Sequence, residues 1–365
     1  MDFKLDDEQQ MIVQTVRKFA ERDLRGWAAD ADRAGAAPDR LIPAASELGF
    51  FVDAVPAASD GMLEGAYSHA TRALRGFELG RGCAAMAALL ETNVEPALAV
   101  EKWGSPSAKQ VLFGSLASGG LAALAHDSRG LLEITADGDN LRVTGKLGPV
   151  PALGAAGHLL VVAKDAVFLF PTDGVKREAM TPSGWRAGKW ATAHLDAKQV
   201  HGWNVLARGD GARAVGEEIL AWARVSLAAR AAGVATSAME LAKAYANERV
   251  QFGQKIGAFE SLIRLRDDAE TAAIGAKLFA LHAAWALDTN QPGAFDLASR
   301  ARVVAGDAVT RATIDAVQIF GGYGFVNDYP VEKLMRDARA FEALYGDERL
   351  GRVLAEKSNV IGERN

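Results

Sequence analysis

Two segments in the second half of the chain carry side chains suited to holding a phosphate and a flat ring. In the first, Arg249 and Phe252 stand three residues apart. An arginine guanidinium is planar and binds two phosphate oxygens side by side, while a phenyl ring offers a face for stacking. Taken singly, Arg249 is better explained as an exposed charge at a helix end. The phosphate-binding interpretation therefore depends on what accompanies it.

The second segment is rich in glycine and reads Gln318-Ile319-Phe320-Gly321-Gly322-Tyr323-Gly324. Its glycines do not have the spacing of the G-x-G-x-x-G turn that binds dinucleotides between a strand and a helix, and no Walker loop occurs in the chain. On its own the segment is most simply a loop between two helices. Its surroundings favour a functional role, because Gln318 lies one helical turn earlier and Arg336-Asp337-Ala338 follows.

Few other residues are candidates for chemistry. His126 is a lone histidine near the end of a predicted strand, and such residues are more often surface or packing residues than catalysts. Cys83 is the only cysteine. Disulfide frameworks and multi-cysteine metal sites are therefore excluded, no metal site is expected, and a reducing cytoplasm is the natural location.

The bulk properties are those of an ordinary globular protein. The chain has 365 residues, 49% of them apolar and 24% charged, with a net charge of −5. This length suits two or three packed domains. A negative chain offers no positive field to nucleic acid or anionic lipid, so neither is an expected partner. The N-terminus lacks the pattern of a secretory signal, and no long uncharged apolar stretch predicts a membrane span.

The elements that must position these residues fall into three regions. Residues 1–118 predict an N-terminal α-helical domain, beginning at Asp6, whose spacing to Gln9 is typical of a helix cap. Its further helices are expected at about 43–48, 67–79 and 84–103. Residues 119–205 predict a middle β-domain, with β-prone runs at 131–135, 141–144, 159–162 and 166–170.

Residues 206–365 predict a C-terminal four-helix bundle. Alanine-rich helical stretches at about 212–248, 261–288, 295–319 and 331–357 are separated by short loops, as in an antiparallel bundle. Periodicity alone therefore indicates a mainly α protein with a central β-domain. The candidate residues Arg249 and Gln318 to Gly322 fall at the ends of the first and third bundle helices.

Three segments together resemble the acyl-CoA dehydrogenases. They are Arg249 to Ile256, the glycine-rich segment after Gln318, and Met335-Arg336-Asp337-Ala338-Arg339 with its continuation to Asp347. The resemblance covers nearly the whole chain and is strongest from 224 to 350. It implies the acyl-CoA dehydrogenase fold and FAD as cofactor. It further implies that the pyrophosphate and adenine end of FAD is bound by Arg249, Gln251, Phe252, Gln318, Gly321 and Gly322.

The same resemblance leaves the catalytic base missing. In that family a Glu follows the Arg-Asp-Ala motif, and counting from Arg336 places it on Tyr345. Some members carry the base one residue before an arginine of the first bundle helix, which here is Ala223. A tyrosine, with a reference pKa of ~10, is a poor base for the α-proton of a thioester. Helical spacing turns the nearby Glu342, Asp347 and Glu348 away from the Tyr345 direction, and these carboxylates are expected on a solvated face.

The middle domain also departs from the family pattern. Aligned on Gly145, Pro149 stands where the family has a Trp that covers the flavin ring, and Pro151 where a Thr donates a hydrogen bond to it. Aligned on Lys146, these positions are Gly148 and Val150, which are no better suited. Proline offers neither an aromatic face nor an N–H.

This pattern of loss predicts a partner. In family oligomers each subunit holds the flavin ring itself and clamps the pyrophosphate end of its neighbour's FAD. The chain keeps the second set of residues and lacks the first. It therefore resembles the Glu-lacking subunit of the heteromeric α2β2 acyl-CoA dehydrogenases of actinobacterial steroid side-chain degradation. The implied partners are a homologous subunit with the catalytic Glu, an acyl-CoA, and electron-transfer flavoprotein as acceptor.

Two other interpretations remain open at this stage. The chain could be a self-sufficient homo-oligomeric flavoenzyme with a displaced base. It could also be a flavin-free scaffold on the same fold.

Overall fold

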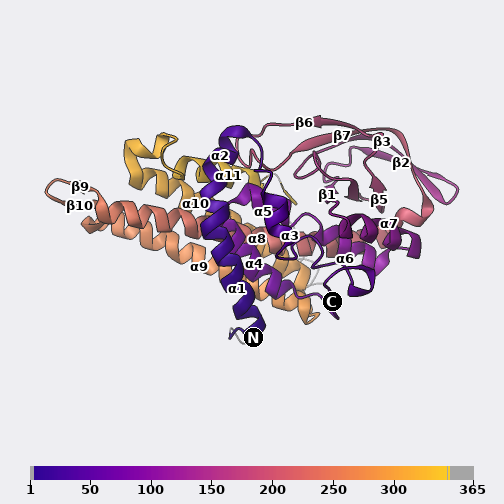
Figure 1. Ribbon diagram of the computed structural model, residues 1–365, viewed down its shortest axis with the longest axis horizontal. Coiled ribbons are helices and arrows are strands. Elements are labelled where there is room, and N and C mark those ends of the chain that lie inside the picture. Colours follow the sequence, from indigo (N-terminus) through magenta and orange to yellow (C-terminus); the bar gives the residue numbers. More distant parts are fainter. Residues whose placement is uncertain (1–3, 343, 346–365) are drawn as a thin grey trace, which may run out of the picture.

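A computed structural model describes residues 4–342 together with 344 and 345. The positions of Asp347 and Glu348, and most of the second half of the helix expected at 331–357, lie outside the described residues. The three-region order predicted from the sequence is confirmed: helices, then strands, then helices. Figure 1 shows the β region at one end of an elongated molecule and the far tips of the bundle helices at the other.

The N-terminal region is built from seven α-helices. They are α1 (Asp7–Phe19), α2 (Arg25–Ala34), α3 (Leu41–Ser46), α4 (His69–Gly82), α5 (Ala84–Leu90), α6 (Val94–Trp103) and α7 (Pro106–Ala117). The predicted cap of α1 is confirmed, because the Asp6 carboxylate accepts from the Gln9 N–H at 2.7 Å and the Gln9 side chain accepts from the Asp6 N–H. The stretch 84–103, predicted as one helix, is two.

Tertiary hydrogen bonds hold the link between α5 and α6. The Asn93 side chain donates to the carbonyls of Phe51 and Gly120 and accepts from the N–H of Ala122 at 2.9 Å. The Thr92 hydroxyl donates to the Ala122 carbonyl, also at 2.9 Å. These side-chain bonds tie the link between the two helices to the start of the β region. Pro96 accounts for the break itself, because it has no N–H to donate to the Thr92 carbonyl and is tolerated only in the first turn of α6.

The middle region contains two four-stranded sheets. Its strands are β1 (Ala122–His126), β2 (Leu132–Asp137), β3 (Asn140–Val150), β4 (His158–Val162), β5 (Ala166–Pro171), β6 (Lys176–Ala179), β7 (Ala191–Val200) and β8 (Val205–Arg208). One sheet has the order β1-β4-β5-β8 and the other β2-β3-β7-β6. A core of buried apolar side chains from both sheets, including Phe168 and Phe170, packs between them.

The C-terminal region consists of long helices that run past one another. They are α8 (Asp210–Glu248), α9 (Glu260–Asp288), α10 (Ala294–Phe320) and the short α11 (Val331–Glu342). A small hairpin of β9 (Val250–Gln251) and β10 (Gln254–Lys255) follows α8. In Figure 1 this hairpin protrudes at the end of the molecule opposite the β region. None of the described helices is long and apolar enough to cross a membrane.

Small residues let the two helical regions approach closely. A Cβ added at Gly80 of α4 would lie 2.2 Å from the Arg230 carbonyl oxygen of α8, and one at Gly233 would lie 2.1 Å from that of Phe77. Such distances are impossible without displacing backbone, so both positions require glycine. Close packing of α4 on α8 brings charged side chains of the N-terminal region beside the C-terminal helices.

Candidate functional site

The predicted phosphate-binding residues lie at the exposed tip of the bundle. The β9–β10 hairpin turns through Phe252 and Gly253, which have positive φ angles of 54° and 79°. The Phe252 side chain is 93% exposed and makes an edge contact with Phe259 at 6.3 Å between ring centroids. An apolar ring in solvent at the end of a rigid turn is available for a ligand or another chain.

The glycine-rich segment lies against this hairpin. It begins where α10 ends, at Gly321, whose φ of 59° favours glycine. The Arg249 guanidinium lies 5.4 Å from the centroid of the Tyr323 ring, so the two sequence-predicted segments are in contact. Gln318, Gly321 and Gly322 are exposed, and Arg249 is partly exposed. The structure thus brings the six predicted cofactor-binding residues to one end of the molecule.

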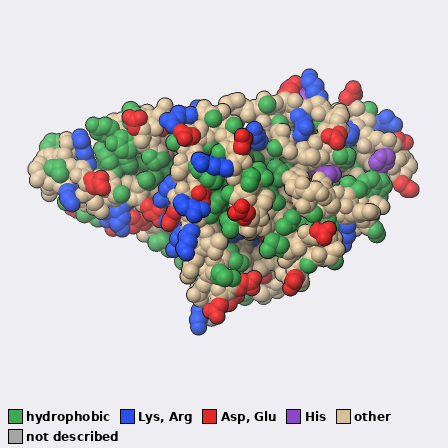
Figure 2. Space-filling model, viewed as in Figure 1, with side chains coloured by type: hydrophobic (Ala, Val, Ile, Leu, Met, Phe, Trp, Pro, Cys, Tyr) green, Lys and Arg blue, Asp and Glu red, His purple; other side chains and the backbone are tan. Residues whose placement is uncertain are grey.

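This end is open and carries apolar surface. Besides Phe252, the exposed side chains include Tyr323, Phe325 at 75% and Val326. Figure 2 shows hydrophobic side chains gathered over the connection between α10 and α11. Beneath them Tyr245 stacks on Phe320 with ring centroids 4.2 Å apart. The stacked rings give the exposed loop a firm base, so its surface is preformed.

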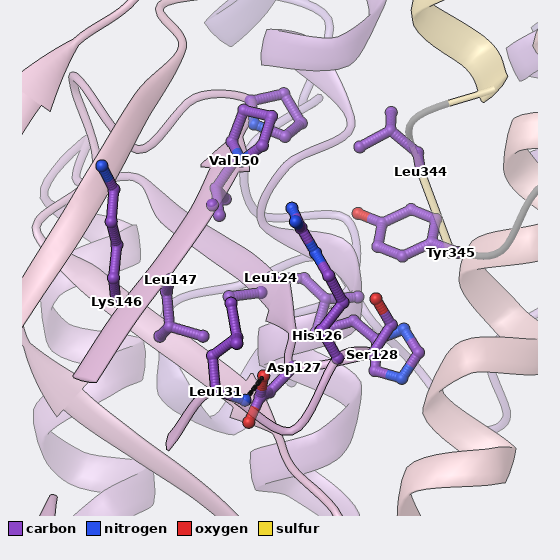
Figure 3. A pocket seen from close by; sticks show the side chains of 15 residues that line it. Leu124, His126, Asp127, Ser128, Leu131, Lys146, Leu147, Val150, Leu344 and Tyr345 are labelled. Atoms are coloured by element: carbon purple, nitrogen blue, oxygen red, sulfur yellow. Dashed lines mark hydrogen bonds between the residues drawn. The ribbon is translucent and has the colours of Figure 1, made fainter. Parts of the chain in front are cut away.

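The pocket beside Tyr345 is, by contrast, small. A cavity of about 90 Å³ is bordered by β1, the end of β3 and the segment after α11, and both Pro149 and Pro151 line it. Figure 3 shows Tyr345 and Leu344 facing Val150 across it, with His126 and Ser128 on one side. Ligand sites for cofactors usually measure about 300–1,000 Å³. A flavin ring therefore does not fit this cavity, whereas a pyrophosphate and an adenine fit the donors and aromatic faces of the open tip.

Tyr345 is held in place by its backbone. The Arg224 Nε donates to the Tyr345 carbonyl oxygen at 2.9 Å, and Arg224 also donates to Ser299 at 3.3 Å. The two predicted base positions, Tyr345 and Ala223, are therefore close in space, and Ala223 is buried. Burial, with Glu95 nearby, raises the pKa of Tyr345 above its ordinary value. The phenol stays protonated at neutral pH and is even less suited to be a base than the sequence suggests.

Charged side chains fill the space on the other side of Tyr345. A void of only about 20 Å³ remains there, and it is bordered by Glu91, Glu95, Arg230 and Trp185 among others. Since one water needs roughly 10–15 Å³ of such volume, the void has room for one or two waters. No acyl chain can enter this space without displacing protein.

A buried ion cluster occupies that position. The Arg72 guanidinium is 2.8 Å from both Glu91 and Glu95, and Arg75 lies 2.8 Å from Glu91 and 2.5 Å from Asp53. The side chains of Arg72, Glu91 and Glu95 are less than a tenth exposed. We define Asp53, Arg72, Arg75, Glu91 and Glu95 as the buried ion cluster. Two arginines share three carboxylates in it, and the buried Arg230 lies close enough to Glu91 to offset the one excess negative charge.

Glu91 borders the void beside Tyr345 and is therefore a candidate for a displaced base, but its basicity is low. Burial acts to raise its pKa, and the charges of Arg75 and Arg72 outweigh burial and hold the pKa at about 2. A carboxylate that releases its proton so readily has little tendency to remove one from a carbon acid. The prediction from sequence overlooked Glu91. Its signal was available: Glu91 and Glu95 are charged residues four apart in the largely apolar stretch 84–100, and Arg72 and Arg75 are three apart in the preceding helix.

The remaining candidate residues have structural surroundings. Glu342 pairs with Arg339 at 2.7 Å in a partly exposed position. His126 is partly buried at the end of β1, and burial, with Arg224, lowers its pKa to about 4. The Asp337 carboxylate of the Arg-Asp-Ala motif accepts from the Trp185 N–H at 2.7 Å, and Arg336 binds Asp32 at 2.6 Å. That motif therefore fastens α11 to the β region and to α2. Among the described residues no group of three or more His, Cys, Asp or Glu is placed to hold a metal ion.

Comparison with known proteins identifies the family. Residues 6–120 match the family model described as the N-terminal domain of acyl-CoA dehydrogenase, and residues 209–357 match its C-terminal domain. The probable acyl-CoA dehydrogenase YngJ of Bacillus subtilis (strain 168) is 30% identical, over 97% of this chain and 98% of that protein. The chain belongs to the acyl-CoA dehydrogenase family.

Other relatives and solved structures agree. The bovine mitochondrial short-chain specific acyl-CoA dehydrogenase is 27% identical over 96% of this chain and 90% of its own length. The structure of butyryl-CoA dehydrogenase from Megasphaera elsdenii superimposes with a TM-score of 0.88 at 25% identity, covering 99% of this chain and 100% of that one. FAD is the cofactor of this family. The similarity supports an oxidoreductase of the acyl-CoA dehydrogenase kind.

Proposed function

We propose that this protein is the non-catalytic subunit of a heteromeric, FAD-dependent acyl-CoA dehydrogenase of the cytoplasm. Its partner is a homologous chain with the catalytic Glu, in an α2β2 assembly that dehydrogenates an acyl-CoA, here a steroid side-chain CoA ester. This chain contributes Arg249, Gln251, Phe252, Gln318, Gly321 and Gly322 to the partner's cofactor. The proposal depends on one difference. The predicted cofactor-binding residues at the tip of the bundle, which we call the open clamp, are exposed or partly exposed, whereas the cavity beside Tyr345, which we call the closed pocket, is small.

The open clamp supports a cofactor held across an interface. Arg249 presents a guanidinium fork to phosphate oxygens, and Phe252 presents its ring at the tip of the hairpin. Phe252 is exposed and Arg249 is partly exposed, at the end of the molecule opposite the β region. A second chain must supply the rest of the site.

The closed pocket supports the absence of chemistry in this chain. The cavity bordered by Pro149 and Pro151 is about 90 Å³ and lacks the size for a flavin ring. The position predicted for the base holds a buried, protonated Tyr345, and the space beside it contains the buried ion cluster. Within this chain an acyl-CoA and a base have no common cavity in which to meet.

In the assembled enzyme the flavin accepts the β-hydride of the acyl group while a carboxylate removes the α-proton. The residues of this chain bind and orient: Arg249 neutralises phosphate charge, and Phe252 covers a ring. The acceptor of the electrons is proposed to be electron-transfer flavoprotein. A chain of a structure described as the electron transferring flavoprotein of Acidaminococcus fermentans resembles this one with a TM-score of 0.89 at 27% identity.

Co-expression with an adjacent homologue that carries the Glu tests the proposal. We expect a complex of two chains of each kind with one FAD per pair, active on acyl-CoA esters with an artificial electron acceptor. The chain purified alone is expected to be colourless and inactive over the same panel of esters. Robust turnover by the chain alone would overturn the proposal in favour of a self-sufficient flavoenzyme. A complex without any flavin would identify a scaffold instead.

A further inference from the structure

A second and larger cleft lies on the opposite side of α8 from Tyr345. It measures about 590 Å³ and is bordered by the start of α4, the end of α6, the first half of α8 and the connection between α9 and α10. Trp222 faces this cleft, whereas Arg224, two residues later, contacts Tyr345. Residues two apart on a helix point about 200° away from each other. The cleft is therefore separate from the Tyr345 pocket and from the clamp.

Its inner wall is aromatic. The His69 ring stacks on Trp222 with centroids 5.7 Å apart, and Trp222 stacks on Trp103 at 5.6 Å. Tyr67 meets His69 edge to face at 5.6 Å. Leu63, Leu98 and Leu287 also line the cleft. Flat rings backed by apolar side chains favour a ligand that is itself flat and largely apolar.

One polar group without a protein partner lies in this wall. His69 is 9% exposed, and no hydrogen bond joins its ring nitrogens to another described residue, so they are open to water or to a ligand. Burial, with Arg72 and Lys102 nearby, lowers the His69 pKa to about 3. The imidazole is therefore neutral at physiological pH, with one nitrogen that donates and one that accepts. A hydroxyl or carbonyl on a ligand would satisfy it.

The charges around the cleft are already engaged. Lys102 pairs with Glu218, and Glu101 pairs with Lys109 at 3.1 Å. The Asp288 carboxylate accepts from the backbone N–H groups of His69 and Ala70 at 2.7 and 2.9 Å. Carboxylates outnumber lysines along the lining, so a phosphate or carboxylate ligand would be repelled. This excludes FAD and CoA esters as occupants.

We propose that this cleft binds a neutral, planar ring compound that carries one hydroxyl or carbonyl group, which hydrogen-bonds to His69. The proposal does not depend on the function assigned to the clamp. The volume falls within the range of small-molecule sites, and His69 is the polar side chain that belongs to the stacked aromatic wall.

Three naphthalene probes test the proposal on the full chain by isothermal titration calorimetry. We expect 2-naphthol to bind once per chain, and naphthalene about three- to tenfold more weakly, because it lacks the hydrogen bond. We expect 2-naphthoate, which is anionic, not to bind. His69→Phe keeps the stacking face and removes the polar group, so it should make naphthol and naphthalene equal.

A matched control is available in the β region. His201 also stacks on a tryptophan, Trp203, at 6.0 Å between centroids, but lies outside the cleft. His201→Phe should leave all three affinities unchanged. The proposal is overturned if 2-naphthol shows no saturable binding at millimolar concentration. It is also overturned if naphthoate binds as well as naphthol, or if His69→Phe preserves the preference for naphthol.

Discussion

The tip of the bundle and the pocket beside Tyr345 are both assembled from the C-terminal helices, yet they differ in what surrounds their polar groups. At the tip, Arg249 lies against the face of Tyr323 and Phe252 is exposed to solvent. Beside Tyr345, Arg72, Arg75, Glu91 and Glu95 are buried or nearly so and are bound to each other. Side chains engaged in this way would have to give up those ion pairs to take up a ligand. Side chains retained for binding are therefore recognised by donors and ring faces that other protein groups do not occupy, rather than by their residue types.

The largest effect is expected when the partner's catalytic Glu and Tyr345, the residue at the matching position of this chain, are replaced in turn. Replacement of the partner's catalytic Glu by Gln should lower kcat of the complex by about 10²–10⁴-fold, the usual contribution of a general base. Tyr345→Phe in this chain should leave kcat unchanged, and Tyr345→Glu should not rescue the partner variant. Steady-state kinetics of the co-purified complexes distinguish these outcomes. A partner variant that retains most of its rate would show that the base lies elsewhere.

The closed pocket is next tested through its stability. Arg72→Ala should leave Glu95 buried without its cation and Glu91 with Arg75 alone, and it should lower the free energy of unfolding by about 3–5 kcal/mol. Urea unfolding followed by circular dichroism measures the loss. Arg213→Ala, which breaks the exposed pair with Glu217, should change almost nothing. Equal effects of the two substitutions would mean that the cluster is not a buried, mutually dependent network.

The open tip should show the reverse: weaker binding with no loss of stability. Arg249→Ala in the complex should weaken FAD binding by about ten- to a hundredfold, the loss of a charge-assisted contact worth roughly 1.5–3 kcal/mol. Flavin fluorescence on dilution measures retention. Arg264→Ala, an exposed position on α9, is the control. Unchanged retention in the Arg249 variant would contradict the clamp.

The smallest effect concerns the pH dependence of stability through His69. In the unfolded chain, His69 takes up a proton near pH ~6.5. In the folded chain its pKa is about 3, so it stays neutral until the pH falls to that value. The stabilising contribution is therefore complete above pH ~6.5 and declines on acidification by up to about 1.4 kcal/mol per pH unit. Between pH 6.5 and 5.5, His69→Phe should lose less stability than the wild type. Parallel curves would mean that His69 protonates in the folded state.

Local rules predicted part of this structure well. The cap at Asp6 and the long alanine-rich helices depend on neighbours within one or two turns, and these are readable along the chain. Strand β1 is not among the β-prone runs, because Ala122 to Ala125 carry no β-branched or aromatic residue. It forms because it pairs in parallel with the buried β4. The division at 118 and 205 remains a prediction.

The site residues show the same limit. Motif spacing predicted Arg249 and the glycine-rich segment, and the structure places them in contact. The buried ion cluster was not predicted, since its bonds join α4 to residues 16 to 23 positions away in sequence. The roles of these charges are ambiguous until the fold shows that Arg72 and Arg75 of α4 face Glu91 and Glu95 of the segment around the start of α6. Partner identity lies on another chain and is not encoded in the contacts of this one.

Helix α4 is synthesised before the residue that caps it. The first free N–H groups of α4, at His69 and Ala70, are bound by Asp288, 219 residues beyond His69. A ribosome makes α4 long before it makes that carboxylate, so until Asp288 emerges the helix relies on Ser68 alone. The glycine-mediated contact of α4 with α8 is likewise delayed. The N-terminal third of the nascent chain therefore waits for the C-terminal half, and a truncated translation product should be a substrate for chaperones and proteases.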